Sequence, residues 1–215
     1  MTHSFTILTP SHRAELDALI AIYQEAIEPS EQKVPSEIQG MLSDTRCVLT
    51  VSRTFGEIAG FTIAQFPVGA DFWLLEYMAV ATNLRRRGVG EALFGQAYRY
   101  GLQRDRERLC LLEVDQTGNR VSANNNAEDR VRFYRRLGCR LVSGLNYLLP
   151  LEANGAPPPQ MLLTYRLPPL ESVGKDTVRE WLSTIYRDIY GKPVSDPRIG
   201  TMVSNLPEVI RINCM

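Results

Sequence analysis

The stretch from Phe72 to Arg104 constrains the fold of this chain more than any other part of the sequence. It begins with FWLLEYMAV, which is apolar or aromatic apart from Glu76 and predicts a buried strand. After a turn, Gly88 and Gly90 open a helix predicted over Gly88–Arg104. Such a turn directs unpaired backbone N–H groups at one point, where the helix dipole also favours negative charge. The pattern therefore indicates a site for a phosphate-bearing ligand.

The spacing of residues in this turn separates it from two other phosphate loops. A dinucleotide-binding fingerprint needs a third small residue at position 93, where this chain has Leu93. A P-loop needs Gly-Lys followed by Ser or Thr, and the turn lacks that sequence. What is left is Arg85-x-x-Gly88-x-Gly90 between a strand and a helix. The alternative interpretation is an ordinary glycine turn with exposed arginines and no ligand.

Length and composition exclude several other classes of protein. The 215 residues, 44% hydrophobic and 22% charged, suit one globular domain with an appendage. The apolar runs are too short for a membrane span, and the N-terminus does not resemble a secretion signal. The four cysteines form no CxxC pair, and His3 and His12 are the two histidines, so we expect no metal site. These features predict a cytoplasmic protein.

The predicted elements alternate between strands and helices around one sheet. Ser11 is the expected N-cap of the first helix, and Gly138 is expected to stop the last helix before the closing strands. The elements are a strand FTIL, helices over 11–26 and 36–42, a hairpin of CVLTVSR and IAGFTIAQF that turns at 55–57, the strand FWLLEYMAV, the helix over 88–104, a strand LCLLEVD, a helix over 128–137, and closing strands CRLVSG and MLLTYRL.

Pro168 and Pro169 mark a boundary, after which an amphipathic helix is predicted to end at Gly191. We therefore predict a domain over 1–167 and a C-terminal helical extension over 168–215. The extension is expected to pack on this domain or on a second subunit, so a homodimer is one of its possible arrangements.

The strand LEYMAV, the turn RRRGVG and the later FYRRLG together resemble the acyl-CoA-binding motifs of the GNAT superfamily of N-acetyltransferases. The resemblance covers about residues 4–167. It implies a mixed α/β (α+β) fold, with a mostly antiparallel central sheet flanked by helices. It also implies acetyl-CoA as cosubstrate, with no metal, and an amine as acceptor.

The same resemblance implies which residues bind coenzyme A. Arg85, Gly88 and Gly90 match the motif, and the loop amides would hold the pyrophosphate. The strand end would pair with the pantetheine arm through its backbone. At the position where many members carry a pantetheine-binding Asn, this chain has Ala127, with Asn125 and Asn126 as neighbours. The contact either shifts to a neighbour, for which Asn126 is the candidate, or is missing. The expected binding residues are Met78, Ala79, Val80, Arg85, Arg86, Arg87, Gly88, Val89, Gly90, Glu91 and Asn126.

Three residues are candidates for the chemistry of acetyl transfer. Tyr134 in FYRRLG matches the family tyrosine that donates a proton to the leaving thiolate. Glu76, a lone carboxylate in an apolar strand, is the first candidate for the base, and strand alternation points it away from Leu75 and Tyr77. Glu113 in LCLLEVD is the second, acting directly or through a water. Packing or surface roles are the alternatives for all three.

The acceptor is less well defined by the sequence. The first helices are acidic, which favours a cationic amine over a neutral one, although solvated helix surface is the alternative. The acidic residues are Glu25, Glu28, Glu31, Glu37 and Asp44. A non-catalytic acyl-CoA-binding sensor or regulatory module is the second functional hypothesis. The near-neutral sequence pI of 6.7 argues against a nucleic-acid surface, even though arginines are concentrated over 85–140.

Overall fold

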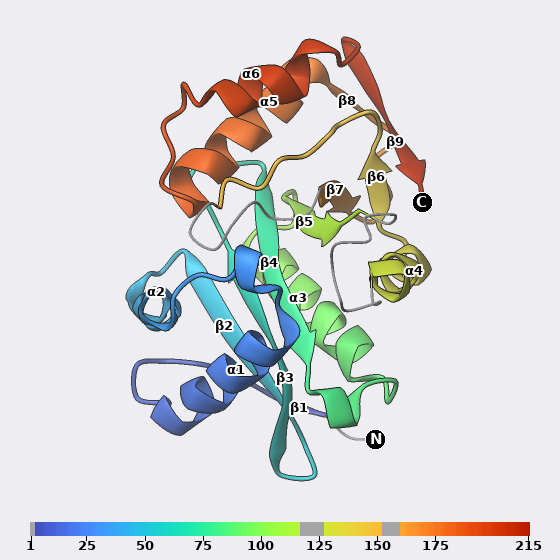
Figure 1. The fold of residues 1–215 in the computed structure, drawn as a ribbon. Helices are drawn as coiled ribbons and strands as arrows, with labels where there is room; N and C mark the ends of the chain where they lie inside the picture. The colour runs from blue at the N-terminus through green and yellow to red at the C-terminus, as the bar shows by residue number, and fades with distance from the viewer. Residues whose placement is uncertain (1–2, 117–126, 152–159) are drawn as a thin grey trace. The chain divides into compact units, whose positions relative to one another are not determined.

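The computed structural model describes residues 3–116, 127–151 and 160–215. The contacts between residues divide the chain into two compact units. Figure 1 shows the elements of both, with colours that follow the residue number. The first unit is Met1–Val68 with Trp73–Arg108, and the second is Gly69–Phe72 with Leu109–Met215. Each unit has its own antiparallel strands and its own covering helices.

The first unit is built on four strands in the order β1-β2-β3-β4, and every neighbouring pair is antiparallel. The β2–β3 hairpin turns at Phe55 and Gly56, whose φ angles are 54° and 84°. Positive φ at both turn residues matches the strand twist of a two-residue hairpin, so the hairpin predicted at 55–57 is confirmed. The elements are β1 (Ser4–Ile7), α1 (Arg13–Ala26), α2 (Pro35–Gly40), β2 (Cys47–Thr54), β3 (Glu57–Gln65), β4 (Phe72–Val80) and α3 (Val89–Arg104), with 3₁₀ turns at Pro29–Glu31, Met41–Ser43 and Thr82–Leu84.

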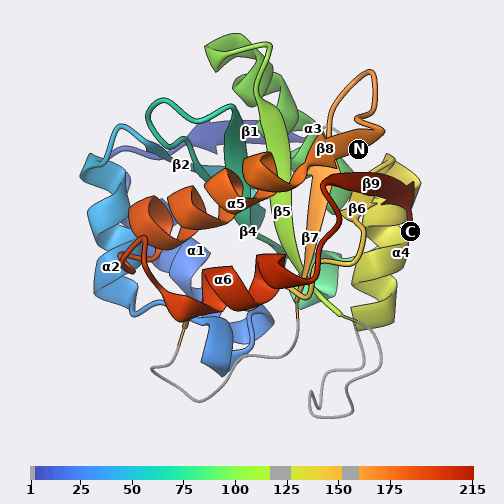
Figure 2. The same ribbon diagram turned by 90° about the horizontal axis from the view of Figure 1, so that it is seen from above.

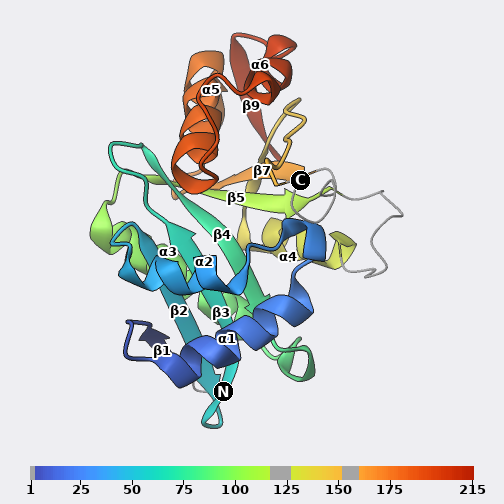
Figure 3. The same ribbon diagram turned by 60° about the vertical axis from the view of Figure 1, so that its left-hand side comes forward.

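Helices cover both faces of these strands, with α1 and α2 on one face and α3 on the other (Figure 3). Leu19 and Tyr23 of α1 are buried against Phe61 and Ile63 of β3. The predicted N-cap of α1 is wrong by one residue, because the helix begins at Arg13 with His12 in the cap position and not Ser11. His12 Nδ1 instead accepts the backbone N–H of Thr9.

Two glycines let α3 approach the strands closely. A Cβ added to Gly60 of β3 would lie 2.5 Å from the carbonyl oxygen of Ala79 and 3.0 Å from Leu93 Cδ1. A Cβ at Gly101 of α3 would lie 2.7 Å from Nε1 of the buried Trp73. A side chain at either position would push α3 away from the strands, so the two glycines permit the close contact between helix and sheet.

The second unit contains five strands in the order β5-β7-β6-β9-β8, again antiparallel throughout. Figure 2 shows α5 and α6 side by side in this unit. Gly138 follows α4 with φ 88°, as predicted for its end. The elements are β5 (Leu109–Asp115), α4 (Ala127–Leu137), β6 (Arg140–Val142), β7 (Gln160–Tyr165), β8 (Ser172–Gly174), α5 (Lys175–Thr184) continued by a π-helical turn at Ile185–Ile189, α6 (Pro197–Ser204) and β9 (Val209–Cys214).

The predicted fold class is confirmed: the strands form mixed, mostly antiparallel sheet flanked by helices. The segment 168–215 contains the predicted amphipathic helix, α5, and also three elements that were not predicted, namely β8, α6 and β9. Strand β9 pairs with β6, so part of this segment belongs to the same sheet as the strands before it. The domain boundary at 167/168 stays a prediction.

We predict that Gly101→Ala lowers the free energy of unfolding by about 1–3 kcal/mol, because the new methyl group overlaps the Trp73 ring. Gly95→Ala in the same helix is the matched control, since a Cβ there meets nothing within 4 Å. It should raise the free energy of unfolding by about 0.5–1 kcal/mol through helix propensity. Urea unfolding followed by circular dichroism measures both values, and equal effects of the two substitutions would contradict the close packing.

Candidate active site

The turn between β4 and α3 is anchored at both ends by buried side chains. Leu84 before the arginines and Val89 after them pack with Leu93 and Ala59. Between these anchors, Arg85, Arg86 and Arg87 are exposed. The turn is therefore fixed to the protein interior while its charged groups face solvent.

The backbone of the turn takes the left-handed conformation twice, at Arg86 with φ 61° and at Gly88 with φ 81°. Gly88 adopts this conformation without strain, whereas Arg86 does so at some cost. A Cβ at Gly88 would meet nothing within 4 Å, so the space beside it is open. Helix α3 begins at Val89, and the N–H groups of its first turn have no intrahelical acceptor. The turn thus combines amide donors, helix dipole and arginine charge at one place.

Two hydrogen bonds hold the segment between the end of β4 and the arginines. Arg85 Nε donates to the carbonyl oxygen of Val80 at 3.2 Å, which folds this side chain back on the strand end. The hydroxyl of Thr82 donates to Glu25 Oε1 of α1 at 2.6 Å. The second bond brings a carboxylate of the acidic first helix to the start of the basic turn.

The end of β4, predicted to pair with pantetheine, is held on one edge by β3. Met78 is paired with Thr62, Ala79 with Phe61, and Val80 with Gly60. Met78 and Val80 pack with the cluster under α3, whereas Ala79 packs under α1. Glu91 lies in the first turn of α3 and is exposed. Asn126 lies outside the described residues.

Glu76 occupies a bulge in β4. Ile63 and Ala64 are consecutive on β3 but pair with Tyr77 and Leu75, so Glu76 is an extra residue on β4. The bulge breaks the alternation of side chains, and Glu76 and Tyr77 both contact the segment Glu31–Lys33. The expectation that Glu76 points away from Tyr77 is therefore wrong, because a regular alternation was assumed.

The Glu76 side chain is completely buried and forms an ion pair with Lys33, whose ammonium donates to Oε1. Its other oxygen accepts the amide N–H of Gln65 at 2.8 Å. Gln65 Oε1 in turn accepts the Cys47 thiol at 2.9 Å. Burial raises the pKa of Cys47 to about 12, so the thiol stays protonated near neutral pH. The carboxylate predicted as the base is thus the centre of a buried polar network.

The segment that carries Lys33 is tied down at three further points. The backbone N–H of Lys33 donates to the hydroxyl of Tyr23 at 2.7 Å. The hydroxyl of Tyr77 donates to the carbonyl oxygen of Glu31 at 2.8 Å. The amide of Gln32 donates to the carbonyl oxygen of Ile27 at 2.8 Å. These bonds replace regular secondary structure in a segment that consists mainly of turns.

In the second unit, Glu113 of β5 accepts hydrogen bonds from two phenols. Tyr147 donates to Oε1, and Tyr190, at the end of the π-helical turn, donates to Oε2 at 2.6 Å. Glu113 is half-buried and Tyr147 is fully buried. The segment after the predicted boundary at 167 thus contributes a side chain to the second candidate base.

Tyr134 lies on α4 with only 9% of its surface exposed. Burial raises the pKa of its phenol well above the ordinary value, so the hydroxyl keeps its proton throughout the neutral range. Arg130, one turn earlier on α4, forms an ion pair with Asp115 at the end of β5, and Asp115 also accepts the amide of Gln160 at 2.9 Å. These contacts fix the helix that carries Tyr134.

The sequence-predicted residues are therefore distributed over both units. The first unit holds Glu76, the strand end and the arginine turn, and the second holds Glu113 and Tyr134. Sequence reasoning did not identify Lys33, Tyr147, Tyr190 or the pair Asp115–Arg130. Lys33 had one available signal, because it is the first lysine in the chain and no other occurs before Lys175.

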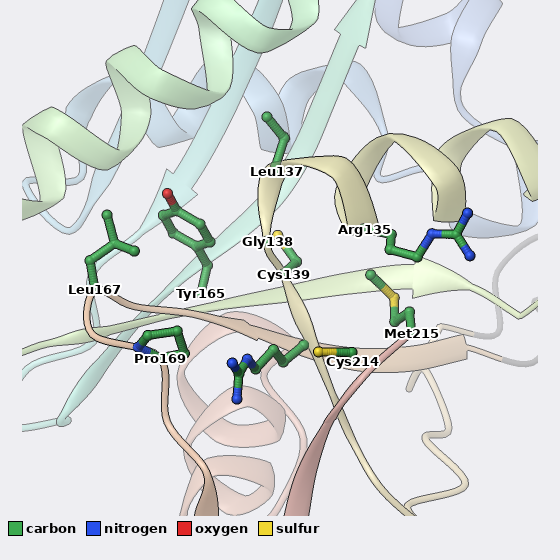
Figure 4. Close-up of a pocket in the computed structure, with 10 residues that line it drawn as sticks. Arg135, Leu137, Gly138, Cys139, Tyr165, Leu167, Pro169, Cys214 and Met215 are labelled. Carbon is green, nitrogen blue, oxygen red and sulfur yellow. The ribbon is translucent and has the colours of Figure 1, made fainter.

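A pocket in the second unit contains none of the predicted site residues (Figure 4). Its volume is about 280 Å³, and it lies between the end of α4, the end of β7 and the last residues of β9. Within the described residues, no group of three or more His, Cys, Asp or Glu side chains is placed to hold a metal ion. No described helix is long and apolar enough to cross a membrane. The cytoplasmic location stays a prediction.

Comparison with known proteins identifies the family of this chain. Residues 16–139 match the sequence model of the acetyltransferase (GNAT) family. Comparison with curated protein sequences gives no significant match.

Solved structures share the fold at low sequence identity. A protein from Bacteroides thetaiotaomicron described as a GNAT-family acetyltransferase superposes with a TM-score of 0.65 at 19% identity, covering 87% of this chain and 98% of that one. The ribosomal-protein-S18-alanine N-acetyltransferase of Escherichia coli gives 0.54 at 19% identity, covering 76% and 92%. An aminoglycoside 6′-N-acetyltransferase solved with coenzyme A gives 0.57 at 19% identity, covering 78% and 98%. Since the family match spans more than half of the sequence and the fold agrees with it, this chain belongs to the GNAT family of acetyltransferases.

Proposed function

We propose that the protein transfers an acetyl group from acetyl-CoA to a primary amine, by direct attack of the amine within a ternary complex. The main support for this proposal is the turn at Arg85–Gly90. In this turn Arg86 and Gly88 adopt the left-handed backbone conformation just before α3 begins. Because this turn presents amide donors beside exposed arginines, it suits a diphosphate. Acetyl-CoA carries a diphosphate and supplies the acyl thioester.

The residues present fit coenzyme A in four respects. The side of Gly88 is open, so the phosphate oxygens can approach the backbone. Arg86 and Arg87 are exposed and supply positive charge. Met78–Val80 leads directly into the turn, which suits the backbone pairing proposed for the pantetheine arm. Val89, Gly90 and Glu91 provide the first amides of α3.

Acetyl transfer also needs a group that takes a proton from the amine and one that gives a proton to the thiolate. Tyr134 is the proposed acid, because it matches the family tyrosine in FYRRLG and its phenol carries a proton at neutral pH. Glu76, Glu113 or a water molecule is the proposed base. The Glu76 carboxylate pairs with one ammonium group, that of Lys33.

The acceptor is proposed to be a cationic amine. Glu25 lies against the start of the basic turn through its bond to Thr82, and Glu28, Glu31 and Glu37 follow in the same part of the first unit. Two fold relatives carry names that specify N-acetyltransfer, to a ribosomal-protein alanine and to an aminoglycoside. Acetylation of amines by this chain is proposed in agreement with those names.

A second candidate function is a non-catalytic acyl-CoA-binding module. One observation favours it: the carboxylates of Glu76 and Glu113 both accept internal hydrogen bonds. Incubation with acetyl-CoA and a panel of primary amines, with detection of the released thiol, separates the two functions. Amine-dependent thiol release supports the transferase, and tight binding of acetyl-CoA without turnover by any amine supports the module.

We predict that Gly88→Ala weakens acetyl-CoA binding at least ~10-fold, because an alanine resists the left-handed conformation and displaces the amide donors. Gly56→Ala is the matched control, since Gly56 has φ 84° and open space beside it at the hairpin tip. Both substitutions should lower the melting temperature similarly, but Gly56→Ala should leave the Kd for acetyl-CoA unchanged. Equal Kd values for the two variants by calorimetry would contradict the role of the turn.

We predict that Tyr134→Phe lowers kcat by about 10²–10⁴-fold while the Kd for acetyl-CoA changes little, because only proton donation is lost. Tyr100→Phe serves as control, since Tyr100 lies on α3 with its ring against Phe66. Steady-state kinetics with the best amine from the panel give kcat for both variants. A Tyr134→Phe enzyme with wild-type kcat would remove the phenol from the mechanism.

A further inference from the structure

One amine of the chain already contacts the carboxylate that is the first candidate for the base. Lys33 is buried, with 8% of its surface exposed, and its ammonium forms an ion pair with Glu76. The other two lysines, Lys175 and Lys192, are half-exposed and belong to the second unit. Lys33 is thus distinguished from them by burial and by its partner.

Glu76 connects this amine to the strand that leads into the proposed acetyl-CoA site. Glu76 lies two residues before Met78–Val80 on the same strand, and these residues lead directly to the arginine turn. The bulge at Glu76 turns its carboxylate toward the segment that carries Lys33. A bond from the Lys33 backbone N–H to Tyr23 and one from Tyr77 to Glu31 hold that segment in place. The amine is therefore pre-positioned before any ligand binds.

We propose that Lys33 is an internal acetyl acceptor, so that the protein acetylates its own Lys33 when acetyl-CoA is bound. This inference rests on the proposed function and on Glu76 as its base. It identifies a modification site and names an acyl thioester as the acetyl donor.

The acetylation of Lys33 needs only its amine, the carboxylate of Glu76 and the thioester. The ammonium of Lys33 gives one proton to Glu76 Oε1, which later releases it to solvent. The Lys33 nitrogen then forms a bond to the thioester carbonyl carbon, and the carbon–sulfur bond breaks. The second proton lost by the nitrogen ends on the departing sulfur, so the products are an amide and a thiol.

Acetylation would change the electrostatics of the first unit. The amide of acetyl-lysine carries no charge, so Glu76 loses its cationic partner in a buried position. One of the two contacts that join the segment Glu31–Lys33 to β4, the ion pair with Glu76, is then weakened, while the bond from Tyr77 to Glu31 is unaffected. The modification therefore loosens the attachment of the segment Glu31–Lys33 to β4.

The test uses the full-length protein and isotopically labelled acetyl-CoA, followed by peptide mass spectrometry. We expect label on Lys33 to appear at least ~10-fold faster than on Lys175 or Lys192, because proximity acts only at Lys33. The two other lysines report background chemical acetylation in the same sample. Urea-unfolded protein should lose the preference for Lys33, and Glu76→Gln should slow labelling of Lys33 selectively.

Lys33→Arg keeps the positive charge and should abolish the fast labelling while circular dichroism stays unchanged. If the wild-type protein binds acetyl-CoA and acetylates an external amine, but Lys33 gains label no faster than Lys175 and Lys192, the inference is overturned and the proposed function stands. If acetyl-CoA does not bind in calorimetry, the proposed function and this inference fail together.

Discussion

The carboxylate of Glu76 lies inside the first unit, and a charge in that position has to be compensated by the surrounding chain. Lys33 supplies the opposite charge and Gln65 supplies a hydrogen bond. To reach Glu76, Lys33 has to lie on a segment that leaves α1, crosses toward β4 and is fastened by Tyr23 and Tyr77. The buried carboxylate is thus one of the contacts that fix the path of the chain between α1 and α2.

The same strand joins this buried charge to the exposed arginine turn. Strand β4 contains the bulge at Glu76 and ends at Val80. The carbonyl oxygen of Val80 accepts a hydrogen bond from Arg85 Nε. Helix α3 packs closely on the strands because Gly60 and Gly101 have no side chains. That packing buries Val89 and so holds the first turn of α3 in a fixed position. Strand β4 therefore positions both the buried carboxylate of Glu76 and, at its end, the exposed arginines of the turn.

The sequence was sufficient to predict the elements whose signals are local. The apolar run of β4, the glycines of the turn and the stop at Gly138 each carry their own signature, and the structure confirms these elements. The bulge at Glu76 could not be predicted, because it depends on the register with β3, and its consequence is that Glu76 and Tyr77 contact the same segment. Strand β8 is too short to show a period, whereas β9 alternates between buried and exposed residues over most of its length, a pattern that its sequence also carries.

The residues around the candidate carboxylates could not be predicted from the sequence, because they lie far from them along the chain. The partners of Glu113 are Tyr147 and Tyr190, and each lies more than thirty positions away along the chain. Tyr134 was identifiable through its motif, but the contacts that fix its helix, between Arg130 and Asp115, arise only when α4 packs on β5. Local motifs thus locate single groups, and tertiary contacts determine the environment of each group.

We propose above all that the arginine turn binds the diphosphate of acetyl-CoA. Its most direct test is calorimetric titration of the purified protein with acetyl-CoA, with NADH and ATP as controls. We predict micromolar binding of acetyl-CoA at one site per chain, and much weaker binding of both controls. Absence of acetyl-CoA binding, or equal affinity for all three ligands, would contradict it.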